Sequence, residues 1–277
     1  MFIPPQLKKL YDDGRLVPFL GAGISMSVVW TEDGVERKGP SWSELVDEAA
    51  RQLGFEIPEL ARIRGTDLQI LEYFKVKNQG EFAKLTNWMV KNMTAPDDAL
   101  HNSPIHRELA RMDKCNVFYT TNFDDFLERG LTINGRQCDV VATEADMGLV
   151  SSSCEVVKFH GDLNHPNMMV LSESHYEERL AFKAAMDYRL RSDVLGRAVL
   201  FIGYSFRDPN VAYLFRLVNE QFERLPQSLS GKRAYIATPD PSDFEISLFD
   251  QRNIEVLPIS GRTMTEGITE LLRAIRS

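Results

Sequence analysis

The chain has 277 residues, of which 43% are hydrophobic and 26% are charged, proportions that are typical of a globular protein with a large core. A formal net charge of −8 argues against a protein built mainly to bind nucleic acid, so we expect no direct nucleic-acid binding. No stretch is long and apolar enough to cross a bilayer, and residues 1–10 contain no apolar run typical of a secretory signal. We therefore expect no membrane insertion.

The three cysteines, Cys115, Cys138 and Cys154, are widely spaced and form no CxxC pair. This pattern argues against a disulfide framework and against a four-cysteine zinc site. We expect a cytoplasmic protein without zinc, in which Cys115 belongs to the core because it lies in an apolar run.

Six short apolar runs predict buried strands: Leu16–Leu20, Val117–Thr120, Val156–Phe159, Val199–Ile202, Ala234–Ala237 and Ile254–Ile259. Helical patterns lie between many of them, for example over Asn210–Arg224, and another lies near the end of the sequence, over Thr265–Ile275. Short buried strands that alternate with helices predict an α/β fold, a Rossmann-like parallel sheet with helices on both faces.

The alternation fails between Ser41 and Arg111, where no good strand pattern occurs. Four helices are predicted there instead, over Trp42–Leu53, Asp67–Lys77, Glu81–Met93 and Ile105–Arg111, with a loop over Asn92–Pro104. We predict one domain over residues 1–277 with a helical insertion or subdomain over 41–111, a candidate lid or assembly surface. Its expected packing residues are Trp42, Phe74, Phe82 and Trp88.

The first polar motif follows the strand Leu16–Leu20 and consists of Gly21, Ala22, Gly23 and, two positions later, Ser25. Glycines permit a tight turn and a close approach to a pyrophosphate, and a helix N-terminus offers free N–H groups to phosphates. The third glycine of the dinucleotide fingerprint is missing. A plain strand–turn–helix corner therefore remains the alternative.

The second motif, Thr120, Asn122 and Asp124, ends another apolar strand. Ligands of doubly wound sheets bind at the carboxyl ends of strands, and Asn122 and Asp124 alternate, so both could reach a ligand there. The alternative is that one of them caps the helix expected to begin near Asp125.

The third motif places His160 and Gly161 after the strand Val156–Phe159. Imidazole suits general acid–base chemistry near neutral pH, although a lone histidine at a strand end is often structural. A metal site with Asp162 and His165 matches no zinc spacing. The histidines expected at the surface are His101, His106, His165 and His175.

The fourth motif, Gly203 and Ser205, follows the strand Val199–Ile202. The serine could hydrogen-bond a ribose or a phosphate. The alternative is a loop into a helix that starts near Pro209, because proline suits a first helical position.

Taken together, the four strand ends resemble the sirtuin superfamily from about Val17 to about Ile259. The resemblance implies that NAD binds here. It implies phosphate contacts from Gly21, Ala22, Gly23 and Ser25, and contacts to the adenosine half from Gly203 and Ser205, with Thr120 grouped among the cofactor-binding residues. It also implies three catalytic residues: Asp124 to hold the carboxamide, Asn122 to position a water, and His160 as the base.

The sequence departs from protein-deacylating sirtuins because it lacks their zinc module of two CxxC pairs and has Met26–Trp30 where they have Gly-Ile-Pro-x-Phe-Arg. Segments 39–45, 160–163 and 203–209 resemble the bacterial sirtuin-like branch, whose members are NAD-consuming effectors of anti-phage defence. This resemblance implies an NAD glycohydrolase that releases nicotinamide and ADP-ribose. The alternatives are a protein deacylase or ADP-ribosyltransferase with the same pocket, and a non-catalytic sensor of NAD or ADP-ribose.

An unregulated NAD hydrolase would harm its own cell, so we expect control by oligomerisation or by a partner. The resemblance suggests a homo-oligomer and a regulatory partner such as a HerA-like ring ATPase or an Argonaute-type protein. No residue identifies that partner.

Overall fold

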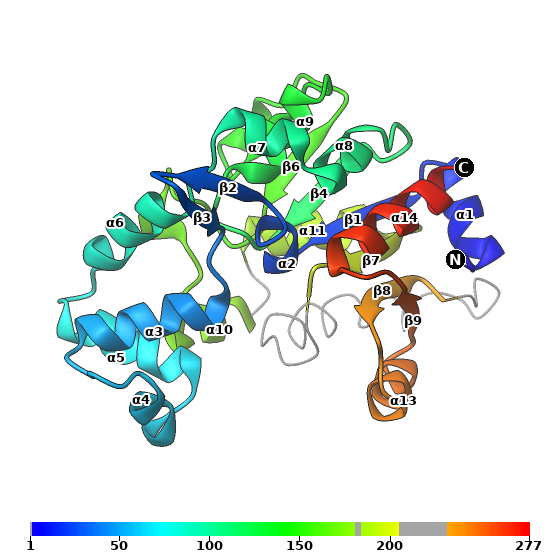
Figure 1. Ribbon diagram of the computed structural model, residues 1–277. Helices are drawn as coiled ribbons and strands as arrows, with labels where there is room; N and C mark the ends of the chain where they lie inside the picture. The colour runs from blue at the N-terminus through cyan, green and yellow to red at the C-terminus, as the bar shows by residue number, and fades with distance from the viewer. Residues whose placement is uncertain (1, 181–183, 205–231) are drawn as a thin grey trace.

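The structure is a computed structural model that describes residues 2–180, 184–204 and 232–277 (Figure 1). Seven strands of the described residues form one sheet in the order β5-β6-β4-β1-β7-β8-β9, and every neighbouring pair is parallel. The strands are β1 (Leu16–Leu20), β4 (Val117–Thr120), β5 (Asp139–Val141), β6 (Glu155–Lys158), β7 (Ala198–Ile202), β8 (Ala234–Pro239) and β9 (Ile254–Ile259). The six predicted strands are confirmed, and the three-residue edge strand β5 was not predicted.

The order of the strands reverses at β1. From β1 the chain moves outward through β4 to β6, and it then returns to build β7, β8 and β9 on the other side of β1. Apart from the edge strand β5, this is the Rossmann order, and such sheets bind ligands in the crevice at the carboxyl ends of the strands where the order reverses.

Helices cover both faces of the sheet. Neighbouring residues of a strand point to opposite faces, so the continuous apolar strands place apolar side chains on both of them. On one face, Leu20 and Phe118 pack with α1 (Pro5–Asp12), α8 (Pro104–Ala110), α9 (Phe126–Ile133) and α14 (Met264–Arg276). On the other, Phe19 and Tyr119 stack with ring centroids 5.2 Å apart and pack with α11 (Ala185–Val194) and α13 (Asp243–Gln251). The predicted fold class is confirmed, whereas the predicted helix Asn210–Arg224 lies outside the described residues.

The segment between β1 and β4 begins with α2 (Ala22–Ser25) and a hairpin of β2 (Val29–Glu32) and β3 (Val35–Lys38). The helices α3 (Trp42–Gln52), α4 (Glu59–Arg64), α5 (Asp67–Lys77) and α6 (Ala83–Asn92) follow, and Figure 1 shows them grouped to one side of the sheet. Their shared core includes Leu71, Phe74 and Phe82, and it also receives Phe123 and Leu171 from the sheet body. This helical group therefore packs directly against the loop that follows β4.

The prediction of a loop over Asn92–Pro104 is wrong for the middle of this range, where the chain forms α7 (Asp97–Asn102). Pro96 precedes this helix, and Asp97 and Asp98 occupy its first turn, where acidic side chains favour the positive end of the helix dipole. The helix packs against α9, as α8 does, and α8 also packs against α14.

The surface prediction for His106 is also wrong, because this side chain is fully buried and its Nδ1 lies 2.8 Å from Ser103 Oγ. Burial lowers the pKa of His106 to about 4. The prediction for Cys115 is confirmed, since its side chain is buried in the core.

The remaining described elements are α10 (Glu173–Leu180), which follows β6, and two short 3₁₀ turns over Asp146–Gly148 and Pro166–Met168. No helix within residues 2–180, 184–204 and 232–277 has the length and apolar character needed to span a membrane.

Candidate active site

The glycines of the first and fourth motifs let two backbones pack in contact. Gly21 N donates to Ile202 O and Gly23 N donates to Gly203 O, each at 2.9 Å. A Cβ on Gly21 would lie 2.7 Å from Gly203 O, and one on Gly203, whose φ is +78°, would lie 2.9 Å from Ile24 N. These glycines therefore fix the turn from β1 into α2 against the end of β7. Close backbone packing is reason enough for glycine at positions 21, 23 and 203, whether or not a ligand binds there.

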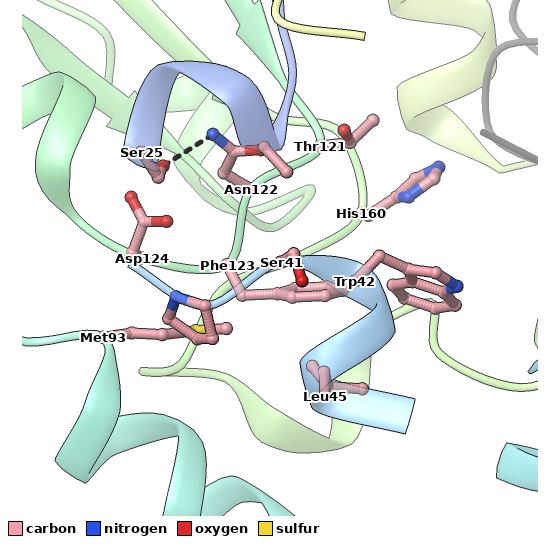
Figure 2. A pocket seen from close by; sticks show the side chains of 12 residues that line it. Ser25, Ser41, Trp42, Leu45, Met93, Thr121, Asn122, Phe123, Asp124 and His160 are labelled. Carbon is pink, nitrogen blue, oxygen red and sulfur yellow. Dashed lines mark hydrogen bonds between the residues drawn. The ribbon is translucent and has the colours of Figure 1, made fainter. Parts of the chain in front are cut away.

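Asn122 is held by two hydrogen bonds at the carboxyl end of β4. Its Nδ2 donates to Gly21 O at 3.0 Å and to Ser25 Oγ at 2.8 Å, the second of which is drawn in Figure 2. Because a backbone carbonyl accepts from Nδ2, the orientation of the amide is defined. Both donors of the amide nitrogen are thus used within the protein, and Oδ1, which has no partner among the described residues, is the atom left for a ligand or a water.

Asp124 is 5% exposed and combines a structural contact with a place in the pocket. One carboxylate oxygen accepts from Phe126 N at 3.1 Å, at the start of α9, so the capping alternative describes part of its role. Burial raises the pKa of Asp124, while the Lys158 ammonium and a hydrogen bond from the Ser25 hydroxyl act to lower it. Ser25 Oγ therefore accepts from the Asn122 amide, and its hydroxyl lies near the Asp124 carboxyl.

His160 is 1% exposed, and Gly161, with a φ of +79°, turns the chain after it. Its ring meets the edge of Tyr176 at a centroid distance of 5.5 Å. Burial, followed by the nearby positive charge of Arg179, lowers the pKa of His160 well below its usual value. The imidazole is therefore neutral at pH 7, and its Nε2 is buried without a hydrogen-bond partner among the described residues.

A cavity that opens to solvent brings these side chains together (Figure 2). Five predicted site residues line it: Ala22, Ser25, Asn122, Asp124 and His160. In Figure 2, Ser25, Asn122 and Asp124 lie on one side of the cavity, and His160 and Trp42 lie on the other. The wall that faces the carboxyl edge of the sheet consists of Pro40, Ser41, Trp42 and Leu45, at the start of α3, together with Met93.

The other predicted site residues do not line this cavity. Thr120 is buried, and its hydroxyl donates to Leu20 O at 2.9 Å and accepts from Asn122 N at 3.0 Å. It therefore holds the backbone of Asn122 against β1 without facing the cavity. Gly21, Gly23 and Gly203 form the packed backbone described above. Ser205 lies outside the described residues, as does the helix expected near Pro209.

His165 is occupied elsewhere, because its Nδ1 lies 2.8 Å from Asp162 Oδ1. Within residues 2–180, 184–204 and 232–277, no group of three His, Cys, Asp or Glu side chains is placed to hold a metal ion.

Two features of the site escaped sequence reasoning. Trp42 was expected only to pack, yet it lines the cavity, and its indole Nε1 is buried without a partner among the described residues. The ammonium of Lys158 lies behind Asp124, 3.2 Å from Glu128 Oε1. A lysine inside the otherwise apolar run from Val156 to Phe159 was the available signal for this buried charge.

The fold and the site define an α/β protein with a pocket of polar and apolar side chains at the carboxyl edge of a doubly wound parallel sheet. The family described as the SIR2-like domain matches residues 116–257, just over half of the chain, and the chain belongs to this family.

The chain is also similar to three curated proteins. It is 28% identical over 230 residues to the NAD(+) hydrolase ThsA of Bacillus cereus (strain MSX-D12), covering 81% of this chain and 44% of that protein. It is 28% identical to the protein of the same name from Cytobacillus dafuensis, covering 97% of this chain and 54% of that protein. It is 25% identical to Defense-associated sirtuin 2 of Bacillus subtilis, covering 84% of this chain and 22% of that protein. The chain spans about half the length of the ThsA proteins it matches.

Proposed function

We propose that the pocket binds NAD and that the protein hydrolyses the bond between nicotinamide and ribose, releasing nicotinamide and ADP-ribose. The observation that carries this proposal is that a neutral, buried His160 lines the same cavity as Asp124 and the hydrogen-bonded pair of Ser25 and Asn122. Pure binding of a nucleotide does not require a base. Two relatives that carry the name NAD(+) hydrolase support the same reaction.

In the proposed reaction, the nicotinamide of NAD leaves with the electron pair of the bond to the ribose anomeric carbon, which neutralises its positive ring. The ribose develops oxocarbenium character, as in glycoside hydrolysis generally. A water oxygen forms the new bond to the anomeric carbon. The water gives up one proton to His160, directly or through a ribose hydroxyl, and the imidazole later releases it to solvent.

The positions of the three side chains fit these roles. Asn122 is fixed through its amide nitrogen, so its oxygen is free to orient the water. Asp124, from the opposite side of the cavity to His160, would hold the carboxamide of the leaving group. Ala22 and Ser25 on α2 would lie along the phosphates or the ribose.

The proposed role in the cell is depletion of NAD during anti-phage defence. The name Defense-associated sirtuin 2, borne by one relative, supports this role. The expected homo-oligomer and a regulatory partner of the HerA-like or Argonaute type rest on the sequence resemblance alone.

The test is NAD consumption by the purified protein, with nicotinamide and ADP-ribose separated by chromatography. We expect Asn122→Ala and His160→Ala each to lower turnover by about 100-fold or more, since positioned proton transfer contributes on that scale. His101→Ala and Asn102→Ala are matched controls, because both side chains are exposed on α7, away from the cavity; they should leave turnover unchanged.

Full turnover in a folded Asn122→Ala or His160→Ala protein would contradict the proposed roles. If the wild type shows no turnover, calorimetric titration with NAD and with ADP-ribose decides the matter, and failure to bind either would overturn the proposal.

A further inference from the structure

Lys158 is a fully buried cation directly behind the proposed active site. Its side chain is 0% exposed, and it lies at the end of β6, two residues before His160. Its Nζ donates to the backbone carbonyl of Asp124 and lies 3.2 Å from Glu128 Oε1 on α9. Because a buried ion pair is often no more stabilising than apolar residues of the same volume, core stability gives little reason for a lysine here.

The charged groups around Asp124 are few. The Lys158 ammonium faces it from β6, the Glu128 carboxyl from α9, and Asp125 is its neighbour in the chain. Asp125 is partly exposed and lies 3.0 Å from Arg129, which also pairs with Asp97. The uncharged Ser25 hydroxyl completes the surroundings from α2. Among the described residues, Lys158 thus supplies the positive charge near both carboxyls: its ammonium pairs with Glu128 and holds Asp124 through the backbone carbonyl.

Each member of this group influences the others. Burial raises the pKa of Asp124 and of Glu128, and the Lys158 charge acts to lower both. The two carboxyls also repel one another, so ionisation of Glu128 disfavours ionisation of Asp124. Removing the ammonium would therefore favour the neutral form of Asp124, and removing the Glu128 charge would favour its carboxylate.

We propose that Lys158 is a positioning residue of the active site. It fixes the loop of residues 122–124 by binding the Asp124 carbonyl, and it keeps the Asp124 carboxylate charged beside the cavity. With both carboxylates ionised, the group has one negative charge in excess. An excess negative charge favours the positive charge that develops on the ribose. The catalytic part of this inference rests on the proposed hydrolysis of NAD, whereas the charge relation between Lys158 and Asp124 does not.

The test compares Lys158→Met with Glu128→Gln, which should move the titration of Asp124 in opposite directions. Carboxyl carbons of ¹³C-labelled aspartate are followed by NMR between about pH 4 and pH 9, and the Asp124 signal is identified by its loss in Asp124→Asn. We expect a higher Asp124 titration midpoint in Lys158→Met and a lower one in Glu128→Gln. Lys114→Met, a change at an exposed lysine, should leave it unchanged.

The pH profile of NAD turnover gives the second readout. If the carboxylate form of Asp124 is required, the acid limb moves to higher pH in Lys158→Met and to lower pH in Glu128→Gln. A structural role alone would lower turnover by a similar factor at all pH values and leave the limb in place.

An unchanged Asp124 midpoint in a folded Lys158→Met protein overturns the inference. If that variant does not fold, Lys158→Gln, which keeps a polar side chain and removes the charge, decides: a higher midpoint supports the inference, and an unchanged one overturns it. Absence of turnover and of NAD binding in the wild type would contradict the proposed function, and the NMR titration would still decide whether Lys158 sets the charge of Asp124.

Discussion

At the scale of single residues, the site is built from side chains that each have a structural contact and a face toward the cavity. The amide nitrogen of Asn122 donates to Gly21 O and Ser25 Oγ, and the Asp124 carboxylate accepts from Phe126 N at the start of α9. These contacts preorganise the polar groups before a ligand arrives, which is the condition for electrostatic stabilisation of a transition state. His160 differs, because its Nε2 is buried without a partner in the described part of the chain.

The glycine contact between β1 and β7 makes a prediction at this scale. Gly203→Ala should lower the free energy of unfolding by about 1–3 kcal/mol, because the new Cβ meets Ile24 N at 2.9 Å and the φ of +78° is unfavourable for alanine. Gly54→Ala is the matched control, since Gly54 has a φ of +92° with nothing within 4 Å of its added Cβ. Urea titration of both variants separates the steric clash of the added Cβ from the cost of a positive φ at alanine. Equal losses of unfolding free energy in the two variants would contradict the packing role of Gly203.

At the scale of elements, the start of α3 forms the wall of the cavity opposite the sheet. Ser41 Oγ accepts from Glu44 N at 3.2 Å, and the Glu44 carboxylate accepts from Ser41 N at 2.7 Å, a capping box that sets where the helix begins. Those hydrogen bonds also hold the pKa of Glu44 below its usual value. The position of Trp42 at the cavity follows from this helix start.

Ser41→Ala should therefore have two effects: a loss of about 1 kcal/mol in the free energy of unfolding and a higher KM for NAD. Ser242→Ala removes the same kind of capping box from α13, which lies on the other side of the molecule from α3, so it should cost similar stability and leave the KM unchanged (Figure 1). Thermal unfolding and steady-state kinetics provide the two readouts. A KM that stays the same in Ser41→Ala would contradict the role of α3 as a wall of the site.

The sequence predicted the sheet well because its buried strands are continuous apolar runs, a pattern that parallel sheets produce. It did not predict the β2–β3 hairpin, although Asp33 and Gly34, with φ values of 51° and 77°, are a typical two-residue hairpin turn. That hairpin is exposed over most of its length, so no apolar pattern marks its strands.

The candidate site was predictable only where each motif ends a strand, because parallel strands deliver their carboxyl ends to one edge of the sheet. Asn122, Asp124 and His160 meet for that reason. Trp42 reaches the cavity, and Glu128 reaches Lys158 behind it, through tertiary packing of α3 and α9 that no local pattern encodes.

At the scale of the whole molecule, the cavity lies between the parallel sheet and the helical group of α3 to α6. One wall is the carboxyl edge of the sheet at β1, β4 and β6, and the other comes from α3 and Met93. Phe123, directly between Asn122 and Asp124, packs into the core of the helical group. A movement of the helical group would therefore displace the loop that carries Asn122 and Asp124.

The central claim is that this cavity is where NAD binds, and the most direct measurement is calorimetric titration of NAD into His160→Ala, which should bind NAD without consuming it. We expect saturable binding that is lost when Ala22→Phe, which fills the cavity, is added to His160→Ala. Ala83→Phe, a matched change at an exposed alanine outside this cavity, should leave binding intact. Equal NAD binding with and without Ala22→Phe in folded proteins would contradict the account.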